Sequence, residues 1–234
     1  MQRRGSSARR AGRSLALAAL TFLAVLACNP NLEAAEGQVV YAIGAVEVHR
    51  AGSTLEAEPG LEVGPGDVVE TGRDGTAILQ LAGRVELKLR ENTRLSLDSL
   101  DEAGVAVGLT RGSLFSRVTG RLSGRYSVRT EAAVAGVRGT EFFVAYGRRI
   151  DELPDVWLCV NEGSVEVSIP RTAQTVTVRQ GEGINIVGGL KLTAPRRYPW
   201  TRRLNWNTDP AKGEVMDRTN LDQAYSDLRD QDYQ

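Results

Sequence analysis

TAILQLAGRVELKLRENTRLSL, residues 76–97, carries the clearest structural signal in this chain. Apolar residues occupy alternate positions on either side of an Ala-Gly pair at positions 82 and 83. The charged residues that alternate with them in the second half are Glu86, Lys88 and Arg90. A period of two is typical of a strand with one buried face, and the Ala-Gly pair fits a tight hairpin turn. We therefore expect Leu87 to face a core, and Lys88 to face solvent and tolerate a change of charge.

Runs of the same kind continue from residue 38 to residue 188. Their alternating apolar positions include Leu95 and Leu97, then Val105, Val107 and Leu109, then Val165, Val167 and Ile169, and finally Val176 and Val178. The runs are separated by turn signals at Gly66-Asp67, Asn92-Thr93 and Glu162-Gly163. Because no segment in this region has a sustained helical period, the sequence predicts an all-β fold. We expect a single roll, solenoid or sandwich-like domain of about ten short strands over residues 37–190.

The N-terminus departs from this composition. Residues 1–14 hold five arginines and no acidic residue, and an apolar stretch of 13 residues follows at 15–27. A basic region followed by a short apolar region is typical of a secretory signal peptide. A membrane-spanning helix needs about 20 apolar residues, so a retained anchor is the weaker interpretation. We predict that residues 1–27 are a signal peptide of the lipoprotein type.

Cys28 follows Val25-Leu26-Ala27, and this sequence resembles the lipobox at which bacterial lipoprotein precursors are lipidated and cut. The resemblance implies a lipid anchor at Cys28 on the periplasmic face of a bacterial membrane. Two alternatives remain open: ordinary cleavage that leaves a free Cys28 on a soluble periplasmic or secreted protein, and a disulfide with Cys159. Cys159 lies in an apolar strand, and we interpret it as a small buried hydrophobic residue.

The charge balance bears on the partner. Without residues 1–27 the chain has 24 basic and 29 acidic residues, so it lacks the basic excess of a nucleic-acid-binding protein. We therefore expect no nucleic-acid partner.

The C-terminal region has two parts. Residues 191–203 hold five basic residues and two prolines, and residues 209–234 hold seven acidic residues against three basic ones. We expect a basic linker and then an acidic tail, docked or frayed, with a short helix over residues 213–230. The residues that would form a surface contacting sugars or phosphates are Arg196, Arg197, Tyr198 and Trp200. The favoured alternative is that these aromatic side chains pack on the β-domain.

Five stretches of the chain, in order, resemble the FecR domain. They are Gly66–Gly72, Leu89–Leu95, Leu109–Leu114, Val137–Val144 and Asn161–Val167. The motif residues are Gly66, Asp67, Thr71, Gly72, Gly112, Gly139, Thr140, Phe142 and Gly163. We expect structural roles for them, with Asp67 capping its own turn and Gly139 at a positive φ or a close backbone contact. Glu141 is expected at the surface.

The resemblance implies an extracytoplasmic β-rich module. Signalling members carry it behind a cytoplasmic helical domain that binds a sigma factor and one transmembrane helix, and it receives the signal from an outer-membrane transporter. Only 14 residues precede the apolar stretch here, so we expect no cytoplasmic domain. The favoured function is a non-enzymatic binding or scaffold lipoprotein with an envelope protein or a glycan as partner. One alternative is an envelope signalling component that relays transporter state to a sigma/anti-sigma system.

The sequence offers little for catalysis. His49 is the single histidine, and the common hydrolase, nucleotide-binding and zinc-binding motifs are missing from the sequence. We predict no catalytic residue, no cofactor and no metal site. A second alternative function, a secreted glycan-binding or glycan-active protein, depends on carboxylates that meet only in space.

Overall fold

The computed structural model describes residues 37–101, 103–119, 124–137, 139–149 and 154–221. The predicted signal peptide, Cys28 and residues 222–234 lie outside the described residues. The part of the chain that is described contains no helix with the length and hydropathy of a membrane span.

The described strands form two sheets. Sheet A contains, in spatial order, β4 (Glu62–Val63), β1 (Gly37–Ile43), β6 (Thr76–Leu81), β7 (Val85–Leu89), β9 (Gly104–Val118), β12 (Glu141–Arg149), β13 (Pro154–Glu162) and β16 (Glu182–Val187), with β17 (Lys191–Leu192) and β18 (Arg196–Arg197) on the last edge. Sheet B contains β3 (Ser53–Glu56), β2 (Val46–Arg50), β5 (Val68–Thr71), β8 (Arg94–Asp101), β9, β10 (Arg125–Arg129), β11 (Val134–Val137), β14 (Ser164–Ile169) and β15 (Gln174–Arg179). Among these pairings, β9 with β10 is parallel and the others are antiparallel.

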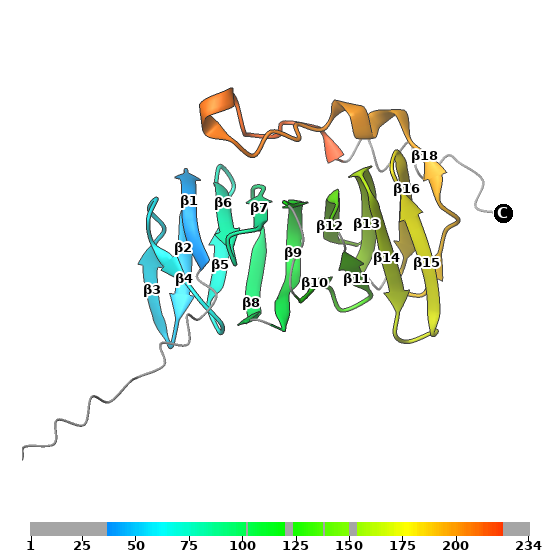
Figure 1. The fold of residues 1–234 in the computed structure, drawn as a ribbon, viewed down its shortest axis with the longest axis horizontal. Coiled ribbons are helices and arrows are strands. Elements are labelled where there is room, and N and C mark those ends of the chain that lie inside the picture. Colours follow the sequence, from blue (N-terminus) through cyan, green and yellow to red (C-terminus); the bar gives the residue numbers. More distant parts are fainter. Residues whose placement is uncertain (1–36, 102, 120–123, 138, 150–153, 222–234) are drawn as a thin grey trace, which may run out of the picture. The chain divides into compact units, whose positions relative to one another are not determined.

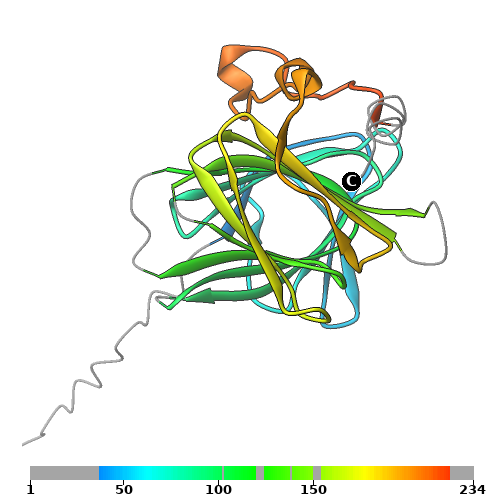
Figure 2. The ribbon, with the colours of Figure 1, turned by 90° about the vertical axis from the view of Figure 1, so that its right-hand side faces the viewer.

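Strand β9 belongs to both sheets. Its first half pairs with β8 in sheet B, and its second half, from Gly112, pairs with β7 and β12 in sheet A. Gly112 has a φ of +89°, and a Cβ atom there would lie 2.4 Å from Thr93 Oγ1, so a side chain would block the crossing. Figure 1 shows the strands following one another nearly in chain order, and Figure 2 shows the two sheets on opposite sides of the core.

The main core lies between the two sheets. The alternating residues of the predicted strands point into it, and Leu79, Leu87, Leu97 and Val107 are completely buried. Each such aliphatic side chain contributes roughly 1.5–3 kcal/mol through burial. Ala82 and Gly83 both have positive φ, as the predicted tight hairpin turn between β6 and β7 requires. The all-β prediction is confirmed.

The described residues form more than the ten strands expected. The additional elements include two- to four-residue strands such as β3, β4, β17 and β18, which are too short to produce an alternating pattern. Their pairing depends on neighbours that are distant in sequence.

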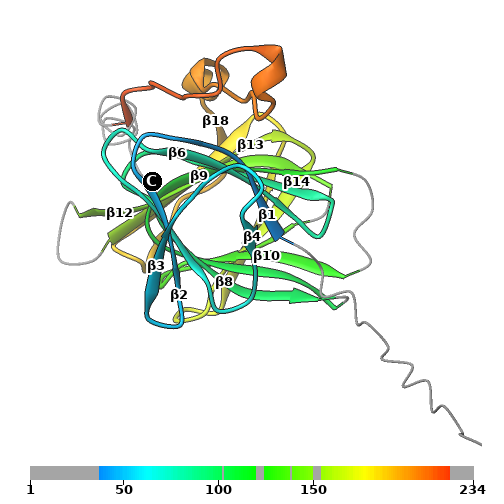
Figure 3. The ribbon, with the colours of Figure 1, turned by 90° about the vertical axis from the view of Figure 1, so that its left-hand side faces the viewer.

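The prediction for the other side of β7 is wrong. Lys88 was expected in solvent, but it is completely buried, and Arg90, the next charged residue on the same side, is 4% exposed. Residues 198–221, called here the covering segment, lie over the outer face of sheet A, as Figure 3 shows. The segment contains two short 3-10 helices, η1 (Pro199–Arg203) and η2 (Pro210–Lys212). Residues 213–220 of the expected helix are irregular instead.

Candidate functional site

The outer face of sheet A carries a second apolar cluster, separate from the main core. Phe115 on β9, Phe143 on β12, and Trp157 and Cys159 on β13 belong to it. The ring centroids of Phe115 and Phe143 are 4.8 Å apart, and those of Phe143 and Trp157 are 5.6 Å apart in an edge-to-face arrangement. This face is therefore apolar over its central strands. The interpretation of Cys159 as a small buried hydrophobic residue is confirmed, and burial raises the pKa of its thiol.

The covering segment places apolar side chains on this cluster. Tyr198 and Leu204 are buried there, and Trp206 packs edge-on against Phe115 with ring centroids 5.2 Å apart. Trp206 Nε1 donates to the carbonyl oxygen of Thr201 at 3.0 Å, so the polar end of the indole is satisfied within the segment. Aromatic residues of the C-terminal region thus pack on the β-domain.

Lys88 is the principal polar contact between the sheet and the covering segment. Its ammonium donates to the carbonyl oxygens of Asn205 and Asn207, at 2.5 and 2.8 Å, and lies 4.2 Å from the centroid of the Phe115 ring. Burial lowers the pKa of Lys88 to about 8, and the Asp217 carboxylate opposes that shift. A buried cation is tolerated when acceptors of this kind surround it.

Arg90 makes the second contact. Its Nη2 donates to the carbonyl oxygen of Thr219 at 3.1 Å and to Glu91 at 3.0 Å. Its Nε lies 3.6 Å from Oδ1 of Asp217, whose side chain is completely buried. Asp217 Oδ2 accepts the main-chain N–H of Asn205 at 2.5 Å. Asp217 thereby joins Arg90 to Asn205 of the covering segment.

Thr208 makes the third contact, and its hydroxyl links residues of β7 and β9. Its hydroxyl donates to Glu86 Oε2 at 2.7 Å and accepts from Arg117 Nη1 at 3.0 Å. Arg117 also pairs with Glu141 at 2.8 Å. Glu141 was expected at the surface, but it is 6% exposed, because it lies between Arg117 and Asn161 and accepts hydrogen bonds from both.

The covering segment also has hydrogen bonds within itself. Asn205 Nδ2 donates to the carbonyl oxygens of Glu214 and Met216, at 2.8 and 3.1 Å. Asn207 Nδ2 donates to the carbonyl oxygens of Asp209, Gly213 and Glu214, at 3.0 to 3.2 Å. The two asparagines that close the loop are therefore the two residues whose main-chain carbonyls bind Lys88.

Comparison with known proteins identifies part of this architecture. Residues 67–166 match the family model described as FecR protein. The chain carries a FecR domain. The matched residues include all of β7, β9, β12 and β13, and therefore Lys88, Arg90, Phe115 and Trp157 of the outer face. The covering segment lies beyond them.

Solved structures share the fold of this FecR domain. Two crystal structures of a protein from Parabacteroides distasonis ATCC 8503, described as a candidate anti-sigma factor, align with TM-scores of 0.51 and 0.50 at 19% identity. Each alignment covers 69% of this chain, and 72% and 73% of the other chains. No curated protein matches the sequence significantly.

The first motif residues of the FecR domain make contacts within the protein. Asp67 accepts the N–H of Gly64 at 2.8 Å and forms a two-pronged ion pair with Arg50, at 2.8 and 2.6 Å. The Arg50 guanidinium lowers the pKa of Asp67. Thr71 Oγ1 donates to the carbonyl oxygen of Arg90 at 2.5 Å and accepts from the N–H of Thr93 at 2.9 Å. Gly66 has a φ of +90°.

The later motif residues also lie within the fold. A Cβ atom on Gly72 would meet that of Ala45 at 2.9 Å, and one on Gly163 would lie 2.7 Å from the carbonyl oxygen of Gly139. Gly139 has a φ of +60° but faces open space, so a positive φ is present there without a close backbone contact. Thr140 and Phe142 are buried.

Three other residues that the sequence singled out lie at the edge of sheet A or on sheet B. Arg196 and Arg197 are exposed on β18, at the edge of sheet A, and the side chain of Trp200 is outside the described part. His49 lies on sheet B, with Nδ1 at 3.1 Å from Thr54 Oγ1 and Nε2 at 3.6 Å from Glu70.

Among the described residues, no group of three or more His, Cys, Asp or Glu side chains is placed to hold a metal ion.

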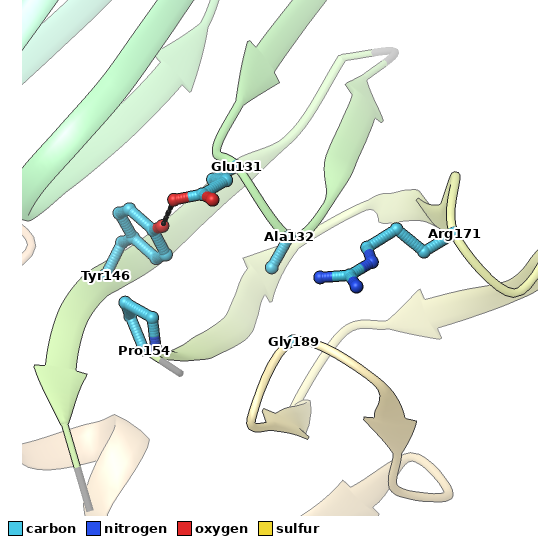
Figure 4. Close-up of a pocket in the computed structure, with 6 residues that line it drawn as sticks. All are labelled: Glu131, Ala132, Tyr146, Pro154, Arg171 and Gly189. Carbon is cyan, nitrogen blue, oxygen red and sulfur yellow. Dashed lines mark hydrogen bonds between the residues drawn. The ribbon is translucent and has the colours of Figure 1, made fainter. Parts of the chain in front are cut away.

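A small recess opens at one end of the domain. It has an empty volume of about 230 Å³, part of it open solvent, and its lining residues are Glu131, Ala132, Tyr146, Pro154, Arg171 and Gly189. The Tyr146 hydroxyl donates to Glu131 at 3.1 Å. Figure 4 shows Arg171 extending toward Ala132 from the turn between β14 and β15.

The covered face was not predicted from the sequence, although the sequence contains a pattern that indicates it. The runs Phe142–Tyr146 and Val156–Val160 are continuously apolar and not alternating. A continuous apolar run is typical of a strand buried on both faces. These two runs indicate that something covers the outer side of β12 and β13.

Proposed function

We propose that this chain is an envelope signalling component whose FecR domain relays the state of a membrane transporter to a sigma/anti-sigma system. The FecR match over residues 67–166 is the observation that carries the proposal. The shared fold with a candidate anti-sigma factor from Parabacteroides distasonis supports it. The family is regulatory and associated with the cell envelope, so a signalling role accounts for these findings better than the scaffold lipoprotein favoured from sequence.

The exposed face of sheet B suits a protein partner. Glu70 pairs there with Arg94 and with Arg111, the latter at 2.7 Å, and Asp98 pairs with Arg129 at 2.7 Å. These residues lie on β5, β8, β9 and β10, which follow one another in sheet B and hold the pairs in a fixed arrangement. Charges arranged in this way steer association and select partners more than they add affinity.

Attachment to a membrane would place the domain where such a partner is found. We propose that residues 1–27 are removed on export and that Cys28 receives the lipid. Mass spectrometry of protein extracted from membranes tests this: the mature N-terminus should be a lipid-modified Cys28, and Cys28→Ser should be unlipidated. An intact Met1, or a mature terminus near Glu36, would contradict the lipid anchor.

A transcriptional measurement tests the signalling role. Cells that lack the protein are compared with cells that express the wild type or Leu87→Asp, a variant expected to unfold. We expect a set of genes sharing one promoter type to change on deletion and to return to normal with the wild type alone. An unchanged transcriptome, with the wild-type protein present in the envelope, would contradict signalling and favour a scaffold.

A further inference from the structure

We infer that the outer face of sheet A is a binding surface for a peptide segment of a partner protein, and that the covering segment occupies this surface in the free chain as an internal ligand. The partner segment would carry an aromatic and an acidic side chain, at the places now taken by Trp206 and Asp217. The inference rests on the contacts of the covering segment, and it stands or falls independently of the proposed signalling role.

Three hydrogen bonds from the sheet to the covering segment go to its main chain. Lys88 binds the carbonyl oxygens of Asn205 and Asn207, and Arg90 binds that of Thr219. Every peptide has such carbonyls, so these three hydrogen bonds do not require the sequence of this segment. Another segment with the same path would satisfy them equally.

Two side chains of the segment add chemical selectivity. Trp206 packs edge-on against Phe115, and Asp217 lies beside Arg90. The acidic residues of the sheet at this place, Glu86 and Glu141, both contact Arg117. Lys88 and Arg90 therefore draw most of their acceptors from the segment, with Glu91 as an additional partner of Arg90. The positive charges of Lys88 and Arg90 explain why this face would prefer an acidic occupant.

The segment would lose little internal structure on leaving. The hydrogen bonds of Asn205 and Asn207 side chains to residues 209–216 lie entirely within it. A unit that keeps its own hydrogen bonds and adds no strand over residues 198–221 can detach without disrupting the sheet.

A buried lysine on the sheet would also be a poor choice if the covering segment had only a structural role. An apolar side chain of similar size at position 88 would pack on Phe115 without the cost of removing a charge from water. The ammonium instead holds two main-chain carbonyls in place, as the binding of a peptide main chain at this face requires.

Competition with a peptide in trans tests the inference. The probe is a fluorescently labelled peptide of residues 203–221, and its binding to the full-length chain is followed by fluorescence polarisation. In the wild type the tethered segment has a high effective concentration and should exclude the peptide. Asn207→Ala loosens the segment and leaves the sheet face unchanged, so it should bind the peptide at least tenfold more tightly than wild type.

Further variants separate binding at this face from nonspecific binding. Lys212→Ala alters an exposed residue of the segment and should behave like wild type. Adding Lys88→Met to Asn207→Ala should weaken peptide binding at least tenfold. Peptides with Ala at position 206 or Asn at position 217 should bind at least fivefold more weakly than the original peptide.

Two results would overturn the inference. One is that Asn207→Ala, folded by circular dichroism, binds the peptide no better than wild type. The other is that Lys88→Met leaves binding unchanged. If Asn207→Ala does not fold, Asp217→Asn serves as the second loosening variant, and the same outcomes apply to it.

Discussion

Lys88 and Asn207 are hydrogen-bonded across 119 positions of the chain, with the ammonium 2.8 Å from the carbonyl oxygen. This contact ties the FecR domain to the covering segment, which follows it in sequence. It also explains why the charged side of β7 is buried in a strand whose pattern indicates one exposed face.

The first prediction concerns the charge at position 88. Lys88→Asp places a carboxylate against two carbonyl oxygens and the face of Phe115, so it should lower the free energy of unfolding by about 3–5 kcal/mol. Lys212→Asp, at a side chain that is 75% exposed, should change it by less than about 0.5 kcal/mol. Urea denaturation of the two variants gives both values. Equal effects would place Lys88 at the surface after all.

The second prediction concerns the opposite side of the same strand. Leu87 is completely buried in the main core, so Leu87→Ala should lower the free energy of unfolding by about 2–5 kcal/mol, and Leu87→Asp should unfold the domain. Circular dichroism and urea denaturation measure these effects. A folded Leu87→Asp protein would mean that the register of β7 is different.

Leu87 and Lys88 show which features of the fold can be predicted from the sequence and which cannot. Alternation places Leu87 correctly because burial between two sheets is a property of the strand itself. Lys88 and Glu141 were misplaced because their burial depends on contacts with residues distant in sequence, Asn207 in one case and Asn161 in the other. The ends of the domain were missed for the same reason: β17 and β18 contain two residues each and exist only through pairing with β16.

The third prediction compares two glycines with positive φ. Gly139→Ala meets open space and should cost about 1–2 kcal/mol from its backbone conformation alone. Gly163→Ala should cost more, because its Cβ would lie 2.7 Å from the carbonyl oxygen of Gly139. Gly139→Val should exceed Gly139→Ala, since a β-branched residue resists positive φ. The ranking is read from urea midpoints, and the reverse order for the two alanine variants would contradict the geometry.

The fourth prediction concerns pH. The pKa of Lys88 is lowered from its ordinary 10.5 to about 8 in the folded protein. Between these two pH values Lys88 binds more protons in the unfolded chain than in the folded protein. The contribution of Lys88 to the free energy of unfolding therefore rises with pH, by at most about 1.4 kcal/mol per pH unit. Below pH 8 the full penalty for burying the charge remains. A neutral amine keeps two N–H donors for the two carbonyls.

Comparison with Lys88→Met isolates this effect, because other titrating groups cancel. The free energy of unfolding of the wild type relative to Lys88→Met should increase from pH 8 to pH 10. A relative stability that falls over this range would mean that the buried ammonium is favoured over the neutral amine.

The accessibility of Cys159 tests most directly whether the covering segment is a separable unit. Cys159 is completely buried in the cluster beneath the segment, and Cys28→Ser makes it the single thiol of the chain. Its alkylation rate is measured in low concentrations of urea. If the segment detaches locally, labelling should be faster than global unfolding permits, nearly independent of urea, and at least tenfold faster in Asn207→Ala. Labelling that occurs only at the rate and with the urea dependence of global unfolding would contradict the account.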